Sequence, residues 1–420
     1  MYPTYMRTVI ANQRKERDLL LARPYLARHT KYDTGELLRS QQIKLITGPR
    51  RTGKSTEALL MLKGRNFAYL NFDDGKLLAQ WDDDAVWESL HAVYPGFEYL
   101  LLDEVQNLEG WDVWVSKLYR LGVNMVVTGS NAKLLSSEMA TLLTGRYIQI
   151  EMLPFSLEEF FAWNSCDLPL VPGTNARAKA LCDDYLHHGG YPETVAARQL
   201  TQSYLSTLFD AIVWKDIAKR HNVRNVEDLN SLAVYLASNF CNPLSANALA
   251  EELGFSSVAT TKKFMGYLHE PYLFFYLPRY NNKLKLMKKA PQKVYIVDNG
   301  FVEAKAFSVS ENLGRFLENQ VFIELLRRGY STERTLFYYR SCNDKETDFV
   351  TRQASRVESL IQVCYDLSSE RTLKREIDAL IECSGELKCT NLTIVTMNEE
   401  RTIEKNGHII KVQPISKFKI

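Results

Sequence analysis

Three features of the sequence predict an α/β protein with several domains. Short apolar strands alternate with helices over residues 41–153, a pattern that indicates a parallel sheet covered by helices. Helical patterns then dominate, and short strands return after residue 294. The 420 residues exceed the roughly 100–200 of an ordinary domain. We expect five segments: a helix and linker (1–40), an α/β core (41–153), a helical region (154–228), a helix-and-hairpin region (229–293) and a second α/β domain (294–420).

Charge and cysteine content exclude several classes of protein. Fifty-two Lys and Arg residues against 50 Asp and Glu give a net charge of +2, so the whole-chain charge does not indicate a polyanionic partner. Seven cysteines without a C-x-x-C pair argue against a disulfide framework or a thiolate zinc site. No apolar run approaches the roughly 20 residues that span a bilayer, and the charged N-terminus lacks a signal-peptide pattern. We expect a cytoplasmic protein with no membrane partner.

The elements of the first two segments follow from local patterns. Residues 6–27 favour a helix with a kink at Pro24. The core then begins with an apolar strand and a Gly-rich turn that opens a helix. The expected strands are 43–47, 67–72, 99–102 and 125–128, and the expected helices are 54–63 and 112–121.

The Gly-rich turn after the first strand carries a phosphate-binding pattern, G-x-x-x-x-G-K-[ST], between a strand and a helix. Its glycines let successive N–H groups face phosphates, and the helix N-terminus adds a partial positive charge. Lys54 is expected to reach the β- and γ-phosphates of ATP, and the Ser55 hydroxyl to bind Mg²⁺. The sequence does not decide which of the two loop arginines faces phosphate. The nucleotide-binding residues are Gly48, Pro49, Arg50, Arg51, Thr52, Gly53, Lys54, Ser55 and Thr56.

An acid pair ends the strand at 99–102 and supports the same site. The carboxyl ends of parallel strands share one edge of a sheet, so Asp103 and Glu104 should lie beside the phosphate loop. Asp103 is predicted to hold Mg²⁺, and Glu104 to orient or deprotonate the attacking water.

Three further residues are candidates for contact with the γ-phosphate or the water. Ser130 and Asn131 follow the strand at 125–128, where an ordinary polar turn is the alternative interpretation. Arg146 could stabilise phosphate charge in cis or in trans, and a salt-bridged surface arginine is its alternative.

These motifs resemble those of AAA-type ATPases. Their residue sequences most resemble those of one group of bacterial and archaeal predicted ATPases. The shared stretches are 46–55, 101–111, 128–135, Gly145-Arg146 and 153–160, followed by His188-Gly-Gly-Tyr-Pro-Glu193 and 318–325. The resemblance covers most of the chain. It implies ATP binding and a C-terminal domain of unknown function, and it leaves the cellular role open.

The segment 229–293 is similar to a winged helix. Helices are expected at 229–237, 245–253 and 258–269, with a break at Gly254, and strands at 273–277 and 284–287 around Asn281-Asn282. Residues 256–293 hold eight Lys and Arg and one acid, which suits contacts to DNA phosphates. A packing module with solubilising lysines is the alternative. The candidate DNA contacts are Lys262, Lys263, Lys283 and Lys285.

The C-terminal segment resembles the restriction-endonuclease-like fold, with a helix that carries Glu318, a hairpin and a further strand. The resemblance implies a metal site in which an acid is followed by Glu/Gln-x-Lys, and here Asp348 and Gln362 stand at the acid positions. Cys364 replaces the lysine and cannot supply a fixed cation. We therefore expect a degenerate nuclease site (Glu318, Asp348, Gln362) in a domain that serves as a binding or assembly surface.

The sequence thus predicts an Mg-dependent ATPase that couples hydrolysis to a conformational change at double-stranded DNA, at another protein or at a second copy of itself. A non-hydrolysing, nucleotide-gated DNA-binding or scaffold protein is the first alternative. Glu104 argues against this alternative, because a protein that only binds the nucleotide does not need this residue. A metal-dependent nuclease is the second, and Cys364 disfavours it.

Overall fold

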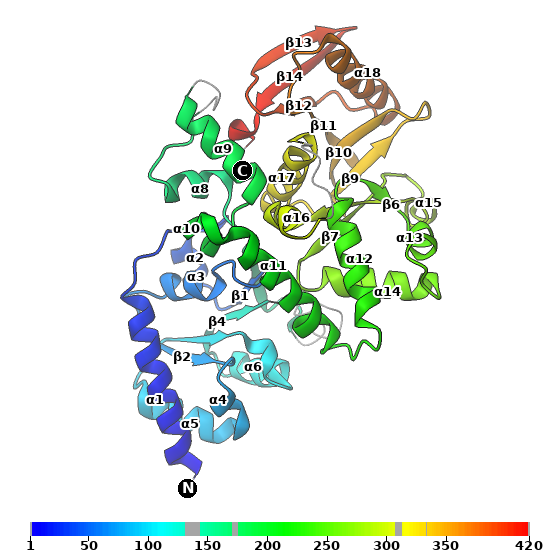
Figure 1. The fold of residues 1–420 in the computed structure, drawn as a ribbon. Coiled ribbons are helices and arrows are strands. Elements are labelled where there is room, and N and C mark those ends of the chain that lie inside the picture. Colours follow the sequence, from blue (N-terminus) through cyan, green and yellow to red (C-terminus); the bar gives the residue numbers. More distant parts are fainter. Residues whose placement is uncertain (1, 131–142, 170–174, 307–312, 333, 419–420) are drawn as a thin grey trace. The chain divides into compact units, whose positions relative to one another are not determined.

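The computed structural model describes residues 2–130, 143–169, 175–306, 313–332 and 334–418. The chain divides into two compact units, residues 1–153 and 154–420 (Figure 1). The division falls where the expected α/β core ends.

The first unit is built on a five-stranded parallel sheet in the order β2-β3-β4-β1-β5. Most strand residues are buried, because helices cover the sheet and leave little of it in contact with water. Four of the observed strands lie within one residue of those expected: β1 (Ile43–Thr47), β2 (Phe67–Asn71), β3 (Tyr99–Asp103) and β4 (Asn124–Gly129). The fifth, β5 (Tyr147–Glu151), had no predicted bounds.

The first helix differs from its prediction. Helix α1 (Tyr2–Leu21) ends before Pro24, so the expected kinked helix over 6–27 is wrong. Proline disfavours helical geometry in the residue before it, and the chain has already left the helix at that point. Helix α1 packs against α5 and β2. The other helices of this unit are α2 (Thr34–Arg39), α3 (Lys54–Met61), α4 (Gly75–Ala79), α5 (Asp83–Val93) and α6 (Trp111–Arg120), with a 3-10 turn, η1, at Val105–Asn107.

The second unit begins with helices, as expected. Ser156 starts α8 with a capping box, in which its side chain and that of Glu159 each accept the other's backbone N–H. The helices are α8 (Leu157–Trp163), α9 (Ala176–His188), α10 (Pro192–Ala196) and α11 (Thr201–Ala211), with a 3-10 turn η4 (Arg198–Leu200) and a π-helical turn η5 (Ile212–Ala218).

Three helices and a three-stranded antiparallel sheet, ordered β6-β8-β7, follow. Along the chain they run α12 (Val226–Ser238), β6 (Pro243–Leu244), α13 (Ala246–Glu252), α14 (Val258–His269), β7 (Phe274–Pro278) and β8 (Gln292–Ile296). The expectation of a winged helix for this segment stays a prediction.

The expected hairpin strand at 284–287 is wrong. These residues form a short helix, α15 (Leu284–Met287), whose Leu284 and Leu286 are exposed. Alternation of leucine and lysine resembles a strand, but four residues also fit one turn of a helix, so the pattern alone did not decide. The partner of β7 is β8 instead, and β8 crosses the expected boundary at 293/294.

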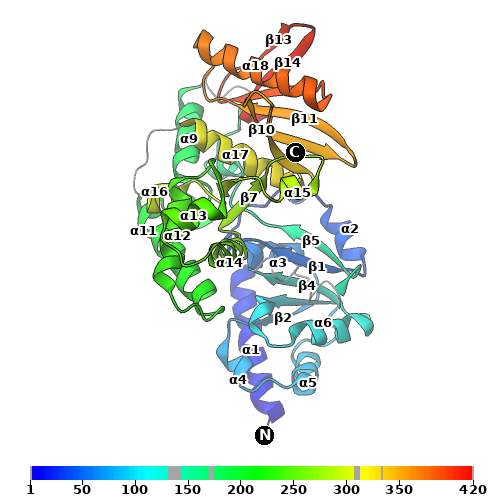
Figure 2. The ribbon, with the colours of Figure 1, turned by 90° about the vertical axis from the view of Figure 1, so that its right-hand side faces the viewer.

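The C-terminal part is a six-stranded mixed sheet in the order β13-β14-β12-β11-β10-β9. Phe349 in β10 lies near Phe322 of α17, whereas the next residue, Val350, belongs to a core shared with α18, because successive strand residues face opposite sides. Figure 2 shows β10 and β11 between the two helices. The elements are α16 (Gly300–Lys305), α17 (Leu313–Arg327), β9 (Leu336–Arg340), β10 (Glu346–Gln353), β11 (Arg356–Val363), α18 (Glu370–Leu387), β12 (Leu392–Thr396), β13 (Arg401–Lys405), β14 (His408–Pro414) and the 3-10 turn η6 (Ile415–Lys417).

Among the helices of the described residues, none combines the length and the apolar character that a membrane crossing requires.

Candidate nucleotide-binding site

The phosphate loop has the backbone conformation of a cradle. Gly48, Arg51 and Gly53 adopt φ values of 144°, 67° and 91°. At Gly48 a Cβ would lie 2.1 Å from the Met152 carbonyl oxygen, so no other residue fits there. Successive left-handed turns let backbone N–H groups converge on an anion, and α3 begins directly after Gly53.

Lys54, the first residue of α3, lies inside this loop. Its Nζ donates to the Pro49 carbonyl oxygen at 2.7 Å and lies 3.9 Å from Glu104 Oε1. The neighbouring Thr52 hydroxyl donates to the same carbonyl at 2.9 Å. The structure thus brings the ammonium of Lys54 together with the loop and with Glu104, as the sequence predicted.

Asp103 ends β3 in a buried position beside Ser55. The Thr128 hydroxyl donates to its Oδ1 at 2.5 Å, and the Tyr69 hydroxyl to its Oδ2 at 3.3 Å. Burial raises the pKa of Asp103 to about 6, and hydrogen bonds with Thr128 and Ser55 act in the opposite direction. A hydroxyl and a carboxylate in contact at the loop are the oxygen donors that Mg²⁺ prefers, so these residues fit the cation.

Glu104 is held by backbone and side-chain contacts. Its φ of 53° is left-handed, and its N–H donates to the Thr128 hydroxyl at 2.9 Å. Gln106 Nε2 donates to Glu104 Oε2 at 2.5 Å and to Ser130 Oγ at 3.3 Å. A non-glycine residue in this conformation is uncommon, and such residues cluster at functional sites. The structure therefore joins Glu104 and Ser130 through Gln106.

Arg146 is not brought to the phosphate loop. It precedes β5, which runs parallel to β1 with Tyr147 beside Ile43, so Arg146 lies at the amino edge of the sheet and the loop at the carboxyl edge. Its guanidinium donates to Ser116 Oγ at 3.0 Å and lies over the Tyr119 ring. The cis role is therefore wrong, and the trans role stays a prediction. Asn131 lies outside the described residues.

Arg28 was missed by the sequence analysis. It lies in the linker between α1 and α2 and donates to the Thr52 carbonyl of the loop and to the Leu153 carbonyl, both at 2.8 Å. No local pattern could reveal this contact, because the residues are 24 and 125 positions apart. Thr128 and Gln106 were also missed, although both lie within the stretches that carry the family resemblance.

The candidate nuclease residues do come together in the second unit. Glu318 in α17 and Asp348 in β10 both contact Lys293, which was not among the predicted site residues. Gln362 Oε1 lies 3.4 Å from the Asp348 backbone nitrogen. Cys364 Sγ is turned to the Asp366 carbonyl at 3.2 Å, and burial raises its pKa to about 11.

The candidate DNA contacts are exposed lysines of the three-helix region. Lys262 and Lys263 are exposed on α14, the helix that follows the break at Gly254. Lys283 and Lys285 lie in the segment that joins β7 to β8. Exposure is what a phosphate contact requires, and it does not by itself identify DNA as the partner.

Comparison with known families matches three successive parts of the chain. Residues 40–161 match an AAA domain (AAA_14), residues 179–311 a domain of unknown function (DUF8612), and residues 313–418 another domain of unknown function (DUF4143). An uncharacterized protein of Methanocaldococcus jannaschii is 31% identical over 397 residues, which are 90% of this chain and 88% of that protein. An uncharacterized protein of Haemophilus influenzae is 35% identical over 346 residues, 77% of this chain and 83% of that one.

Solved structures show more distant similarity. A Walker-type ATPase of Pyrococcus abyssi is 14% identical with a TM-score of 0.41, and covers 68% of this chain and 99% of its own. The ORC1 protein of Aeropyrum pernix, solved in complex with DNA, is 12% identical with a TM-score of 0.34, over 67% and 94% of the two chains. At these sequence identities and TM-scores, the two structures do not indicate what this chain binds.

Proposed function

The chain belongs to a family of AAA-type P-loop ATPases with a C-terminal domain of unknown function, and from this premise we propose that it hydrolyses Mg-ATP and couples the reaction to a DNA partner. The observation that carries hydrolysis is the position of Glu104. Its carboxylate is held by Gln106 and lies 3.9 Å from Lys54 Nζ, the group expected at the γ-phosphate.

The residues of the loop divide the work on the substrate. The backbone N–H groups of the loop and the Lys54 ammonium bind the phosphates, and Ser55 and Asp103 would hold Mg²⁺. Mg²⁺ held there would supply positive charge to the β- and γ-phosphates. Glu104 accepts a proton from the attacking water, and Gln106, which also donates to Ser130, orients this carboxylate.

Two substitutions test these separate roles. We expect Lys54→Ala to abolish nucleotide binding, because it removes the cation from the loop. Glu104→Gln should retain binding and lower turnover by about 10²–10⁴-fold, since the amide cannot accept the proton. Fluorescent ATP binding and phosphate release measure the two quantities, and Glu109→Gln, an exposed acid of the same unit, is the control. Equal loss of ATP affinity in the lysine and glutamate variants would sink the assignment.

The DNA partner is supported by the exposed lysines of α14 and of the segment between β7 and β8. If about four lysines meet phosphates, the slope of log K against log salt on duplex DNA should be about −3.6. Lys262→Ala with Lys263→Ala should reduce this slope by about 2 and weaken random-sequence duplexes equally, because backbone contacts carry no sequence information. Anisotropy titrations at several salt concentrations measure the slope.

The matched control changes two exposed lysines elsewhere in the second unit, Lys179→Ala with Lys374→Ala. It should leave the slope unchanged. Undetectable binding at about 50 mM salt, with and without ATP, would reject DNA and leave a protein or a second copy of the chain as the partner.

A further inference from the structure

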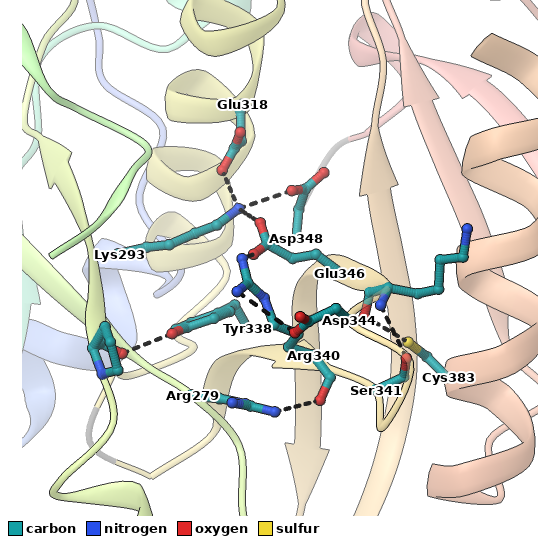
Figure 3. A network of polar contacts seen from close by, with 12 residues as sticks. Arg279, Lys293, Glu318, Tyr338, Arg340, Ser341, Asp344, Glu346, Asp348 and Cys383 are labelled. Atoms are coloured by element: carbon teal, nitrogen blue, oxygen red, sulfur yellow. Dashed lines mark hydrogen bonds and ion pairs between the residues drawn. The ribbon is translucent and has the colours of Figure 1, made fainter. Parts of the chain in front are cut away.

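Three carboxylates of the second unit converge on one buried lysine (Figure 3). Lys293 of β8 places Nζ 2.9 Å from Glu318 Oε1, 2.8 Å from Glu346 Oε1 and 2.9 Å from Asp348 Oδ1. The lysine side chain is only 2% exposed. Glu318 comes from α17 and the other two acids from β10, so the cluster joins three elements.

Each N–H donor of the Lys293 ammonium has a carboxylate partner. An ammonium has three N–H donors, and here each of three carboxylates receives one contact. The remaining partners are also protein groups: the Tyr295 hydroxyl donates to Glu318 Oε1 at 2.7 Å, and the Val363 N–H to Asp348 Oδ2 at 2.9 Å. Burial opposes the charge of Lys293, but the three acids outweigh it and raise the pKa of this lysine well above its ordinary value.

We propose that the Lys293 ammonium stands in the place of a divalent cation and closes the nuclease-like site as an internal ion cluster. An ammonium and a small divalent cation both require oxygens on several sides, and one position cannot hold both. Removal of the lysine leaves three carboxylates facing a common point, a donor set that suits Mn²⁺ or Mg²⁺. The wild-type site is therefore closed to metal, and Lys293→Ala opens it.

The same contacts argue against Lys293 as the missing lysine of an active nuclease. Such a lysine must stabilise the attacking hydroxide or the phosphate beside a bound metal. Here its three donors are engaged by the acids that would have to bind the metal. Each acid has a further partner as well, with Arg340 3.2 Å from Glu346 Oε2.

The cluster also joins the β6-β8-β7 sheet to the C-terminal sheet. Nearby contacts have the same effect: the Tyr338 hydroxyl donates to the Pro291 carbonyl and the Arg279 guanidinium to the Arg340 carbonyl, both at 2.7 Å (Figure 3). The ends of the lysine-bearing segment between β7 and β8 are thus anchored on the nuclease-like sheet.

The test is Mn²⁺ binding to the nucleotide-free full chain, measured by the paramagnetic resonance signal of free Mn²⁺. Any ion at the phosphate loop is common to all variants, so only differences count. We expect Lys293→Ala to bind one more Mn²⁺ per chain than the wild type, and Lys293→Ala with Asp348→Asn to lose that ion. Lys289→Ala, an exposed lysine of the same region, should match the wild type.

Two results would overturn the proposal. One is Mn²⁺ binding or Mn²⁺-dependent DNA nicking by the wild type that Asp348→Asn removes. The other is a folded Lys293→Ala chain, shown by circular dichroism, that gains no ion. If Lys293→Ala does not fold, the wild type and Asp348→Asn decide alone: equal Mn²⁺ stoichiometry supports the closed cluster, and a loss in Asp348→Asn overturns it.

Discussion

Two clusters in this chain pair a buried lysine with acids, and their geometry differs. In the first unit Lys54 Nζ contacts a loop carbonyl at 2.7 Å and lies 3.9 Å from Glu104. In the second unit Lys293 Nζ lies within 2.9 Å of three carboxylates. The first arrangement is built on a loop with left-handed backbone, and the second on strands and a helix.

The difference shows that backbone context, more than residue type, decides what a lysine–acid cluster does. A loop of convergent N–H groups surrounds Lys54 with positive potential, which suits an anionic ligand. Three carboxylates surround Lys293 with negative charge, so its ammonium binds groups of the same chain and not a ligand. The first cluster is suited to function and the second to stability.

The largest expected effect is a difference in the free energy of unfolding between variants of Lys293 and of Lys54. Lys293→Met leaves one buried and two partly buried carboxylates without their cation, and we expect a loss of about 3–5 kcal/mol in the free energy of unfolding. Lys54→Met should cost about 1 kcal/mol, the order of a single hydrogen bond, while ATP binding is lost. Urea unfolding of the two variants measures this contrast. Similar losses in both would contradict the distinction between the clusters.

A second comparison concerns two buried aspartates, Asp103 and Asp298, because burial raises the pKa of each to about 6. Asp298 accepts the N–H groups of Gly190 at 2.8 Å and Gly300 at 2.9 Å. The paired glycines at 189–190 leave room for this carboxyl, because a Cβ at Gly189 would lie 1.7 Å from Asp298 Oδ1. Its pKa in the folded chain exceeds the ordinary 3.8. The protonated Asp298 carboxyl therefore makes its full contribution to the free energy of unfolding below pH 3.8. This contribution is lost as the pH rises through about 6.

We expect Asp298→Asn to be less stable than the wild type at low pH, because its amide N–H₂ meets a backbone N–H. The difference in the free energy of unfolding between the wild type and Asp298→Asn should shrink by roughly 3 kcal/mol between about pH 4 and 7. The reason is that the carboxyl of the wild type titrates in this range and the amide does not. Urea unfolding across this pH range measures the difference, with the exposed Asp167→Asn as control. A difference that stays constant with pH would show that Asp298 has no raised pKa.

The smallest expected effect concerns the support of the phosphate loop. Arg28→Ala removes two hydrogen bonds from a charged donor to the Thr52 and Leu153 carbonyls. We expect ATP affinity to fall about 10-fold, an effect of about 1.4 kcal/mol, because the loop is less well held. Arg23→Ala, an exposed arginine of the same linker, is the control in a fluorescent ATP titration. Unchanged affinity in the Arg28 variant would mean that the loop holds its shape without the linker.

The parallel sheet and the phosphate loop could be predicted because their signals are local. An apolar run such as residues 99–102 forms a buried strand wherever it pairs, and the Gly48–Ser55 pattern needs only its neighbours. Residues 284–287 show the limit of such reasoning, because a four-residue alternation fits a strand or a helix. In the structure β7 pairs with β8, and residues 284–287 form a short helix in the segment between these two strands.

The sequence by itself determined the α/β class, the family, and the residues that form the phosphate loop and the acid pair at the end of β3. Tertiary structure alone decided that Arg146 lies at the opposite edge of the sheet from the loop, that Arg28 contacts the loop and that Lys293 meets three carboxylates. The physical reason is distance along the chain. Lys293 meets acids 25, 53 and 55 residues away, and only the packing of β8 against α17 and β10 brings their charges together.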